Sequence, residues 1–500
     1  MPQNYDVIII GGGVAGLSAA LHLTERGIKP LVLEADSEYF GGRLSGGKKI
    51  RINHQDKDWE FREEHGVHGF WASYNNLTAM LQRNGILPNF SDAREETWIY
   101  RRGGDISRAE VGSAIRSGCL PAPLHYLNLF MRPRFWNMLG LADILSLPAV
   151  LYGLFFAVGI DPLKENQPIE GMRLSHLVKH WGPAVRAFVV GLARNGLSAR
   201  PEEIQLSGFL AFLRFYTVMR KDSWRFRYLP EDAGTSLVEP LLRAIQKSGG
   251  ELILGSPVIK INKNELGWQV DCGKYKFQSE AVILATDAQN ARTILQNSQS
   301  TREKSANMYF PPGIATAIIR IWYSDVPRNG AEAGIFSGEF ALDNYFWLHR
   351  IFSPYKDWYL ETGGSAIEAH IYGPPELLQE EDAGLLARAI SDISAAYPEL
   401  RGKRIDQSIT RHPKTHTLFG VGPQGKHLGV ETPWPDLYCC GDWVLDPFPA
   451  LFLERACATG ILAANNILDK MNKPAWDVIH PKPPEPFAQF IQSIIIRGRK

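Results

Sequence analysis

The first part of the chain contains a strand, a glycine-rich turn, a helix and a second strand in direct succession. Residues 6–10 form an apolar, β-branched run, which is typical of a strand buried on both faces. Three glycines follow at G-x-G-x-x-G spacing, and residues 17–24 have the pattern of a helix. A second apolar run, residues 30–33, ends at the acidic residue Glu34. This order of elements predicts a Rossmann-type unit that binds a dinucleotide.

Each glycine of this turn has a physical role. Gly11 allows the tight turn from strand to helix, Gly13 lets a pyrophosphate approach the backbone, and Gly16 lets helix and strand pack closely. The helix N-terminus offers free N–H groups and a partial positive charge to the phosphates. Glu34 lies 18 residues after Gly16, where a carboxylate can bind the ribose hydroxyls of adenosine. The predicted contacts of this segment are Gly11, Gly13, Val14, Ala15, Gly16 and Glu34.

A second motif follows Glu34. Ala35 continues the chain toward Gly41-Gly42-Arg43. This spacing of Glu and Gly-Gly-Arg resembles the second signature of the amine oxidase and phytoene desaturase superfamily. The resemblance implies that the dinucleotide is FAD, and that the glycines and the arginine lie beside its pyrophosphate and flavin. It adds Ala35, Gly42 and Arg43 to the predicted FAD contacts.

The end of the chain carries a third motif of the same superfamily. Residues 437–443 form an apolar strand that ends in Gly441-Asp442, and residues 450–468 have the pattern of a long helix. The resemblance implies that Asp442 binds the ribitol or phosphate, and that the helix start faces the flavin N1–C2=O edge. A helix N-terminus there stabilises the negative charge of reduced flavin. The predicted contacts are Gly441, Asp442, Pro449, Ala450 and Leu451.

The middle of the chain returns to the cofactor. A helix is expected from residue 234 to residue 245, and strands are expected at residues 251–261, 268–272 and 281–287. The resemblance implies that Val258 contacts the adenine through its backbone and that Ala285 and Thr286 lie near the pyrophosphate.

These motifs predict an α/β fold with two domains. A discontinuous, Rossmann-type FAD-binding domain takes in residues 1–70, 230–290 and 430–470. A mixed α+β substrate domain takes in residues 71–229 and 291–429. Two domains also suit a chain of 500 residues, because single cores rarely exceed about 300.

Several features limit the chemistry. No second G-x-G-x-x-G follows a strand, so an internal NADPH site is not expected, and oxygen or a quinone is the expected electron acceptor. The five cysteines contain no C-x-x-C motif, which argues against a redox-active disulfide. A net charge of +1 and the lack of a recognition motif exclude nucleic acid as an expected partner.

A cluster of polar residues precedes the first strand of the substrate domain. Residues 63–71 read EEHGVHGFW, and the resemblance places this region beside the flavin. Glu64 and His68 are therefore the candidate catalytic residues. Satisfaction by local backbone hydrogen bonds is the alternative for both. A metal ion is not predicted, because a site needs three converging ligands and no clear third ligand joins the histidines.

Two segments are apolar enough to suggest a membrane. Residues 135–160 nearly reach the length of a spanning helix but are interrupted by Asp143 and Pro148. A monotopic helix pair, the lining of an apolar tunnel and a core helix are the alternatives. Residues 481–500 form an amphipathic tail that ends in Arg497, Arg499 and Lys500. The N-terminus lacks the features of a signal peptide, so peripheral membrane contact on the cytoplasmic side is expected.

The C-terminal motif and the stretch at residues 63–71 are most similar to β-carotene desaturase/methyltransferase enzymes of the isorenieratene synthase type. This resemblance implies an FAD-dependent oxidoreductase that desaturates a hydrophobic isoprenoid, a carotenoid, with aromatisation of an end ring and a methyl shift. A flavin amine oxidase is one alternative, for which Lys414 is a candidate lysine and Trp443 a candidate aromatic residue. A polyisoprenoid isomerase or dehydratase, and a non-catalytic flavoprotein that carries a lipid, are the others.

Overall fold

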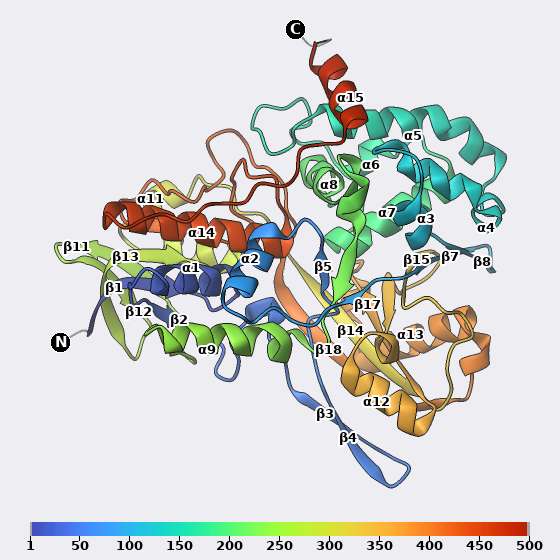
Figure 1. Ribbon diagram of the computed structural model, residues 1–500, viewed down its shortest axis with the longest axis horizontal. Helices are drawn as coiled ribbons and strands as arrows, with labels where there is room; N and C mark the ends of the chain where they lie inside the picture. Colours follow the sequence, from blue (N-terminus) through green and yellow to red (C-terminus); the bar gives the residue numbers. More distant parts are fainter. Residues whose placement is uncertain (1–2, 498–500) are drawn as a thin grey trace.

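Strands from three distant segments of the chain form the first sheet (Figure 1) in the computed structural model, which describes residues 3–497. Five of these strands run parallel to their neighbours, and two join through antiparallel pairs. The order is β10 (Glu251–Ile253), β2 (Leu31–Leu33), β1 (Gln3–Ile10), β13 (Lys276–Leu284), β12 (Gly267–Asp271) and β11 (Lys260–Asn264), and β19 (Leu437–Cys439) also pairs with β13.

Helices cover this sheet because its central strand is apolar on both faces. The residues of β1 from Val7 to Ile10 are all buried. Helix α1 (Val14–Thr24) follows the glycine turn, and α14 (Phe452–Lys470) packs on α1. Figure 1 shows these two helices side by side, with α9 (Glu239–Lys247) along the sheet below them. The βαβ unit expected from the sequence is therefore confirmed.

One predicted strand is wrong. Residues 251–261 were expected to be continuous, but the chain leaves the sheet between β10 and β11. The backbone N–H groups of Gly255 and Ser256 donate to the carbonyls of Asp36 and Glu34 instead. The chain is thus held against the end of β2 rather than in a ladder, which brings Val258 to that edge of the sheet.

The second sheet has seven strands and carries the other half of the molecule. Its order is β18 (Arg404–Thr417), β14 (Gly313–Tyr323), β17 (Ser365–Ile371), β16 (Asn344–Trp347), β15 (Ala333–Gly338), β7 (Glu96–Arg102) and β8 (Asp105–Glu110). One face packs its apolar residues on helix α13 (Asp382–Ala396), as Ile319 and Ile367 do. Helix α12 (Ser353–Thr362) lies near α13 (Figure 1).

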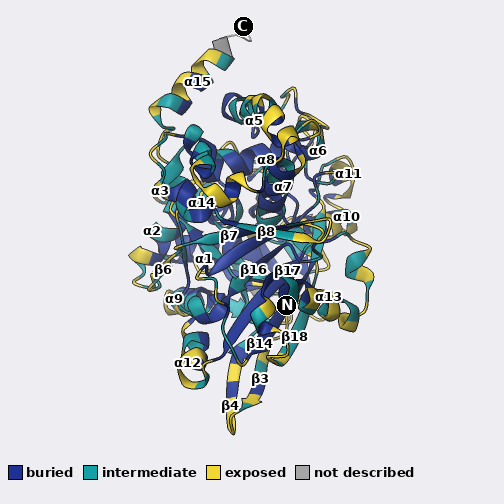
Figure 2. Ribbon diagram, turned by 90° about the vertical axis from the view of Figure 1, so that its right-hand side faces the viewer, coloured by how far each residue is buried: buried dark blue, intermediate teal, exposed yellow. Residues whose placement is uncertain are grey.

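A layer of helices covers the remaining side of the molecule. It consists of α3 (Gly112–Ser117), α4 (Pro133–Trp136), α5 (Leu141–Gly159), α6 (Leu174–Leu177), α7 (Pro183–Leu197) and α8 (Leu206–Leu213). Helix α15 (Pro486–Arg497) packs against α5. Figure 2 shows both α5 and α15 at one end of the molecule, with exposed residues along them. Arg499 and Lys500, at the basic end of the predicted tail, lie outside the described residues.

Smaller elements join the two halves. A hairpin of β3 (Lys49–His54) and β4 (Lys57–Arg62) projects from the molecule (Figure 1). A three-stranded sheet has the order β5 (Gly69–Trp71), β9 (Phe226–Tyr228), β6 (Ser91–Asp92). The other helices are α2 (Asn75–Arg83), α10 (Ala288–Asn297) and α11 (Arg302–Ser305). The three segments assigned to the FAD-binding domain supply every strand of the first sheet, while the exact domain bounds stay a prediction.

The apolar segment at residues 135–160 is not a helix pair. It forms the end of α4 and one continuous helix, α5, that runs through Pro148. Asp143 does not interrupt the helix, because it is buried and its carboxylate accepts the N–H groups of Ala184 and Val185 at the start of α7. An acidic group at a helix N-terminus is stabilised by the helix dipole, so this charge has a structural role.

Candidate functional site

A cavity of about 890 Å³ extends from the first sheet to the second. At one end, its walls are the carboxyl ends of β1 and β2, with Gly11 and Glu34. At the other end, its walls include Ile335 of β15, Phe346 of β16 and His370 of β17. The predicted dinucleotide site and a chamber in the second half of the molecule therefore form one continuous space.

The three glycines of the turn have the geometry that their predicted roles require. Gly11 has a φ of +109°, and a Cβ there would lie 2.7 Å from the carbonyl oxygen of Ala285. A Cβ on Gly16 would lie 2.0 Å from the carbonyl oxygen of Gly11, so helix and strand touch at that point. A Cβ on Gly13 would meet no atom closer than 3.9 Å. Gly13 thus faces open space in the cavity, where a phosphate can approach the backbone.

Glu34 is fixed in position at the end of β2. Its carboxylate accepts the N–H of Gly12 at 2.8 Å and the N–H of Asp36 at 3.0 Å. Two backbone donors orient the carboxylate before a ribose arrives. The predicted contacts that line the cavity are Gly11, Gly13, Val14, Ala15, Glu34, Ala35, Gly42, Arg43, Val258, Ala285, Thr286, Gly441 and Asp442. Their roles toward FAD stay predictions.

The second and third motifs meet in space. Arg43 Nη2 lies 2.6 Å from Asp442 Oδ2, and the hydroxyl of Thr417 donates to Asp442 Oδ1. Arg43 is 31% exposed and Asp442 is 7% exposed. The ion pair closes the cavity wall where the first sheet meets β18, and it presents a positive and a negative group to one ligand.

The predicted start of the C-terminal helix is wrong. Helix α14 begins at Phe452, and residues 449–451 do not line the cavity in the described part of the chain. The buried guanidinium of Arg455 donates to the carbonyls of Val444, Asp446, Phe448 and Ala450, which holds this segment as a loop. Phe452, Leu453 and Ala456 of the helix line the cavity, and the roles of Pro449, Ala450 and Leu451 toward FAD stay predictions.

Four histidines gather where the two halves of the cavity meet. The rings of His65 and His412 stack with centroids 3.6 Å apart. Burial lowers the pKa of His68 and of His412 to about 4 and that of His416 to about 3, so these imidazoles are neutral at pH 7. One ring nitrogen of each of these three has no hydrogen-bond partner among the described residues.

These histidine nitrogens provide a test of fit for the predicted cofactor. Buried polar atoms are rarely left without partners, so a polar ligand is expected beside His68, His412 and His416. An isoalloxazine ring carries several such polar atoms at its edge. Together with the open approach at Gly13, the residues of this cavity fit a flavin dinucleotide.

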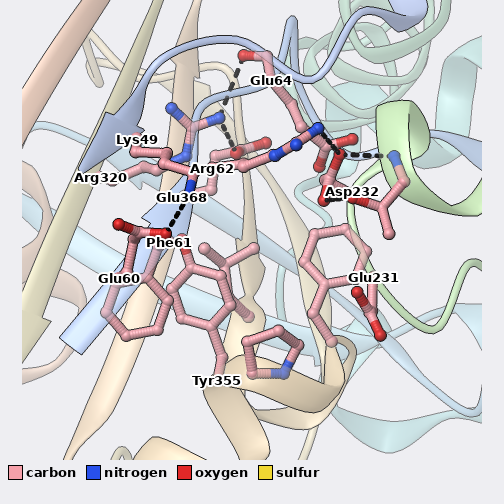
Figure 3. A pocket seen from close by; sticks show the side chains of 14 residues that line it. Lys49, Glu60, Phe61, Arg62, Glu64, Glu231, Asp232, Arg320, Tyr355 and Glu368 are labelled. Carbon is pink, nitrogen blue, oxygen red and sulfur yellow. Dashed lines mark hydrogen bonds and ion pairs between the residues drawn. The ribbon is translucent and has the colours of Figure 1, made fainter. Parts of the chain in front are cut away.

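Glu64 does not lie in this cavity. Figure 3 shows it beside Arg320 and Glu368, in a separate pocket of about 200 Å³. The Glu64 carboxylate accepts the N–H of Ala233 at 2.6 Å, and Arg320 Nη2 donates to the Glu64 carbonyl. Burial and then repulsion from Glu368 raise the pKa of Glu64 well above its usual value. This placement gives Glu64 a structural role, in holding the backbone at Ala233. His68, in contrast, lines the large cavity.

The far chamber is lined by apolar and aromatic side chains of which only Trp71 belongs to a sequence motif. They come from many elements, and no local spacing connects them. They are Trp71, Val111, Ile115, Phe188, Leu192, Phe212, Trp224, Phe226, Tyr228, Ile335 and Phe346. Apolar walls of this kind favour a hydrophobic ligand and exclude water.

The candidate residues for an amine oxidase lie elsewhere. Lys414 is exposed, and no lysine among the described residues lines the large cavity. Trp443 is fully buried outside it, with its indole N–H donating to the carbonyl of Thr286. Neither residue can meet an amine beside the flavin in this arrangement.

Comparison with solved structures gives the fold. Cyclohexylamine oxidase from Brevibacterium oxydans matches with a TM-score of 0.67 at 15% identity, over 94% of this chain and 100% of that one. Putrescine oxidase matches with a TM-score of 0.66 at 14% identity, over 93% and 99% of the two chains. The α/β fold with a Rossmann-type domain is confirmed.

Comparison with curated sequences gives relatives along nearly the whole chain. Carotenoid phi-ring synthase of Chlorobaculum tepidum is 23% identical, over 93% of this chain and 88% of its own length. The 15-cis-phytoene desaturase of Capsicum annuum is 22% identical, over 93% and 78%. These relatives confirm the predicted superfamily and its carotenoid desaturase type.

A family profile described as flavin containing amine oxidoreductase matches residues 14–468. The matched region begins at Val14, just after Gly11 and Gly13, and takes in Gly16, Gly42-Arg43, Gly441-Asp442 and nearly all of α14. The prediction of a flavin-dependent oxidoreductase is thereby confirmed. The chain belongs to the family of flavin-containing amine oxidoreductases.

Proposed function

We propose that this protein is an FAD-dependent oxidoreductase that desaturates a carotenoid and converts one of its end rings into an aromatic ring with a methyl shift. The observation that carries the proposal is the apolar chamber, which continues directly from the dinucleotide site. Relatives named carotenoid phi-ring synthase and phytoene desaturase support this class of substrate. The resemblance to the isorenieratene synthase type supports ring aromatisation.

Bound FAD supplies the acceptor for a hydride from a carbon next to conjugated double bonds. The residues of the chamber exclude water and stabilise the charge that develops on the substrate. Aromatic side chains such as Trp71, Phe226 and Phe346 exclude water and offer their ring faces to a delocalised positive charge. Neutral His68, His412 and His416 avoid repelling that charge. Oxygen or a quinone is the proposed acceptor that reoxidises the flavin.

Helices α5 and α15 support a proposed contact with a membrane. Helix α5 has the length and composition of a membrane-crossing helix, and 28% of its most apolar window is buried. Leu141, Leu145 and Tyr152 of α5 and Phe490 and Ile494 of α15 expose large apolar side chains. We propose that this face lies in the interface of the membrane on its cytoplasmic side, which would bring the protein to a hydrophobic substrate.

Anaerobic reduction of the bound flavin tests the function. Purified protein in detergent is mixed with carotenes and, separately, with a panel of amines, and the absorbance of the flavin is followed. Bleaching by a carotene that has a β-ring, together with a product carrying an aromatic ring, is the expected result.

Other outcomes identify the alternatives. Bleaching by amines alone would move the activity to the amine oxidases. Conversion of a polyisoprenoid by the reduced enzyme, without net flavin turnover, would indicate an isomerase or dehydratase. No change with any of these compounds would favour a non-catalytic lipid carrier.

A further inference from the structure

Strand β17 carries a row of polar side chains that points to the cavity. Along residues 367–372 the sequence alternates apolar and polar, and Glu368, His370 and Tyr372 share one face because side chains alternate along a strand. Ile367 and Ile371 occupy the opposite face, in the core beneath α13. Glu368 and His370 are buried, and His370 and Tyr372 line the large cavity.

The row is connected by short hydrogen bonds. The hydroxyl of Tyr372 lies 2.6 Å from His370 Nδ1, and His370 Nε2 lies 2.8 Å from Glu368 Oε1. Arg320 stands directly opposite Glu368 on β14, and its Nη2 lies 2.6 Å from Glu368 Oε2. Figure 3 shows Arg320 and Glu368 close together. The connection runs from the cavity wall to a buried ion pair.

The charge of Glu368 determines which way each hydrogen bond points. Burial opposes ionisation, but Arg320 and the hydrogen bonds from His370 and Val67 outweigh it and lower the pKa of Glu368 to about 2. A carboxylate only accepts hydrogen bonds, so His370 Nε2 must donate to it. His370 Nδ1 is then the acceptor, and the Tyr372 hydroxyl donates its proton to it. His370 Nδ1 is therefore positioned to accept the hydroxyl proton of Tyr372.

The row also lies against the segment that the resemblance places beside the flavin. A Cβ on Gly66, whose φ is +116°, would lie 2.8 Å from His370 Cε1. The N–H of Val67 donates to Glu368 Oε1 at 2.7 Å. The same carboxylate thus fixes the backbone next to the expected flavin position and orients the histidine behind Tyr372. This arrangement has the form of a base held by a second residue and oriented by a third.

We propose that Tyr372 is the general base that removes a proton from the substrate, with His370 and Glu368 as positioning residues that relay and stabilise the proton. This inference rests on the proposed function. Hydride loss to the flavin, the oxidant, leaves a delocalised cation on the substrate. An adjacent C–H bond then breaks, its electron pair forms the new double bond, and its proton goes to the Tyr372 oxygen. The hydroxyl proton of Tyr372 passes to His370 Nδ1, and Glu368 stabilises the imidazolium.

The test compares Tyr372→Phe with Tyr397→Phe. Tyr397 is a buried tyrosine on the far side of the second sheet, its hydroxyl donates to Tyr345 at 2.6 Å, and it lines neither cavity. Both variants lose one hydrogen-bonded hydroxyl. We expect Tyr372→Phe to slow formation of the desaturated carotene in a single turnover by about 100-fold or more, with carotene affinity unchanged. Tyr397→Phe keeps the wild-type rate. Equal rates for Tyr372→Phe and the wild type would overturn the relay.

A second measurement requires no substrate. In protein with ¹⁵N-labelled histidine, the His370 signals are assigned through their loss in His370→Gln. We expect a proton on Nε2 and an unprotonated, hydrogen-bonded Nδ1 whose shift changes in Tyr372→Phe. A proton on Nδ1 would overturn the relay. If wild-type flavin is not reduced by any carotene while this tautomer is present, the proposed function fails and the hydrogen-bonded row remains.

Discussion

Arg43 and Asp442, 399 residues apart in the sequence, form an ion pair of 2.6 Å in the wall of the large cavity. The pair joins the Gly-Gly-Arg motif to the Gly-Asp motif at the opposite end of the chain. Neither motif alone shows how its charged residue is held, because each side chain is oriented by the other. The contact explains how two motifs so far apart in the sequence come to line one cavity.

Asp442→Asn is expected to weaken FAD binding. The substitution removes the charge that orients Arg43, and a charge-assisted hydrogen bond contributes about 1.5–3 kcal/mol, which corresponds to roughly 10–100-fold in Kd. Titration of apoprotein with FAD, followed by flavin fluorescence, measures the change. Glu25→Gln is the control, because Glu25 forms a comparable pair with Arg83 outside the cavity. An unchanged Kd in Asp442→Asn would show that the pair is not part of the FAD site.

Gly13→Ala and Gly16→Ala are expected to fail in different ways. A methyl group on Gly16 would lie 2.0 Å from the Gly11 carbonyl, so the apoprotein should lose about 1–3 kcal/mol of unfolding free energy. A methyl group on Gly13 meets open space, so the apoprotein should keep its Tm while FAD affinity falls. Thermal unfolding with and without FAD separates the two effects. Equal loss of apoprotein stability in both variants would contradict the assigned roles.

Glu454 should make stability depend on pH. It caps α2 by accepting the N–H groups of Asn76 and Leu77, and burial raises its pKa to about 7. Because the folded pKa exceeds the unfolded one, the contribution is full below about pH 4.5 and is lost as pH rises through 7. Glu454→Gln removes the ionisable carboxyl group and with it this pH-dependent contribution to stability.

The measurement is the difference in unfolding free energy between the wild type and Glu454→Gln. Between pH 5 and 7, the unfolding free energy of the wild type should fall relative to that of Glu454→Gln by up to about 1.4 kcal/mol per pH unit. Glu96, whose pKa burial also raises to about 7, is present in both proteins and cancels. A constant difference over this range would show that Glu454 does not take up a proton on folding.

Lys414→Met should leave flavin reduction unchanged. The side chain is exposed and does not line the large cavity, so it cannot act beside the flavin. The rate of anaerobic reduction by the substrate is the measurement. A decrease of tenfold or more would support the amine oxidase alternative and contradict the observed placement of Lys414.

Leu145→Asp should reduce binding to vesicles of anionic phospholipid. Leu145 of α5 is 72% exposed, and withdrawing such a side chain from a membrane costs about 1.5–3 kcal/mol, so partitioning should fall about tenfold or more. Leu360→Asp is the matched control, because Leu360 is 76% exposed on α12. Co-sedimentation measures both. Equal effects of the two substitutions would contradict a membrane face at α5 and α15.

The sequence alone predicts those parts of the site whose geometry depends on the spacing of neighbouring residues. The glycine turn, Glu34 and the strand before Asp442 were predicted because consecutive residues determine their geometry. The start of α14 was placed too early, because Arg455 holds the preceding carbonyls from within the helix and no local pattern shows that contact.

Residues whose role depends on strand pairing were misjudged or missed. Glu64 was expected beside the flavin, but it lines a separate pocket with Arg320 and Glu368, which come from strands more than 250 residues away. Glu368, His370 and Tyr372 were missed although their alternation with apolar residues was visible. That alternation is typical of a solvated strand face, and only the fold shows that the polar face is buried.

The order of the strands in the first sheet limits when the protein can acquire its cofactor. Strand β13 is flanked by β1, which is synthesised first, and by β19, which is synthesised near the end. A ribosome that has not passed Leu437 therefore holds a chain without Asp442 and without α14, however complete its glycine turn is. We therefore expect the flavin to bind only after the last wall of the cavity has been translated, and fragments that end before it should be free of flavin when purified.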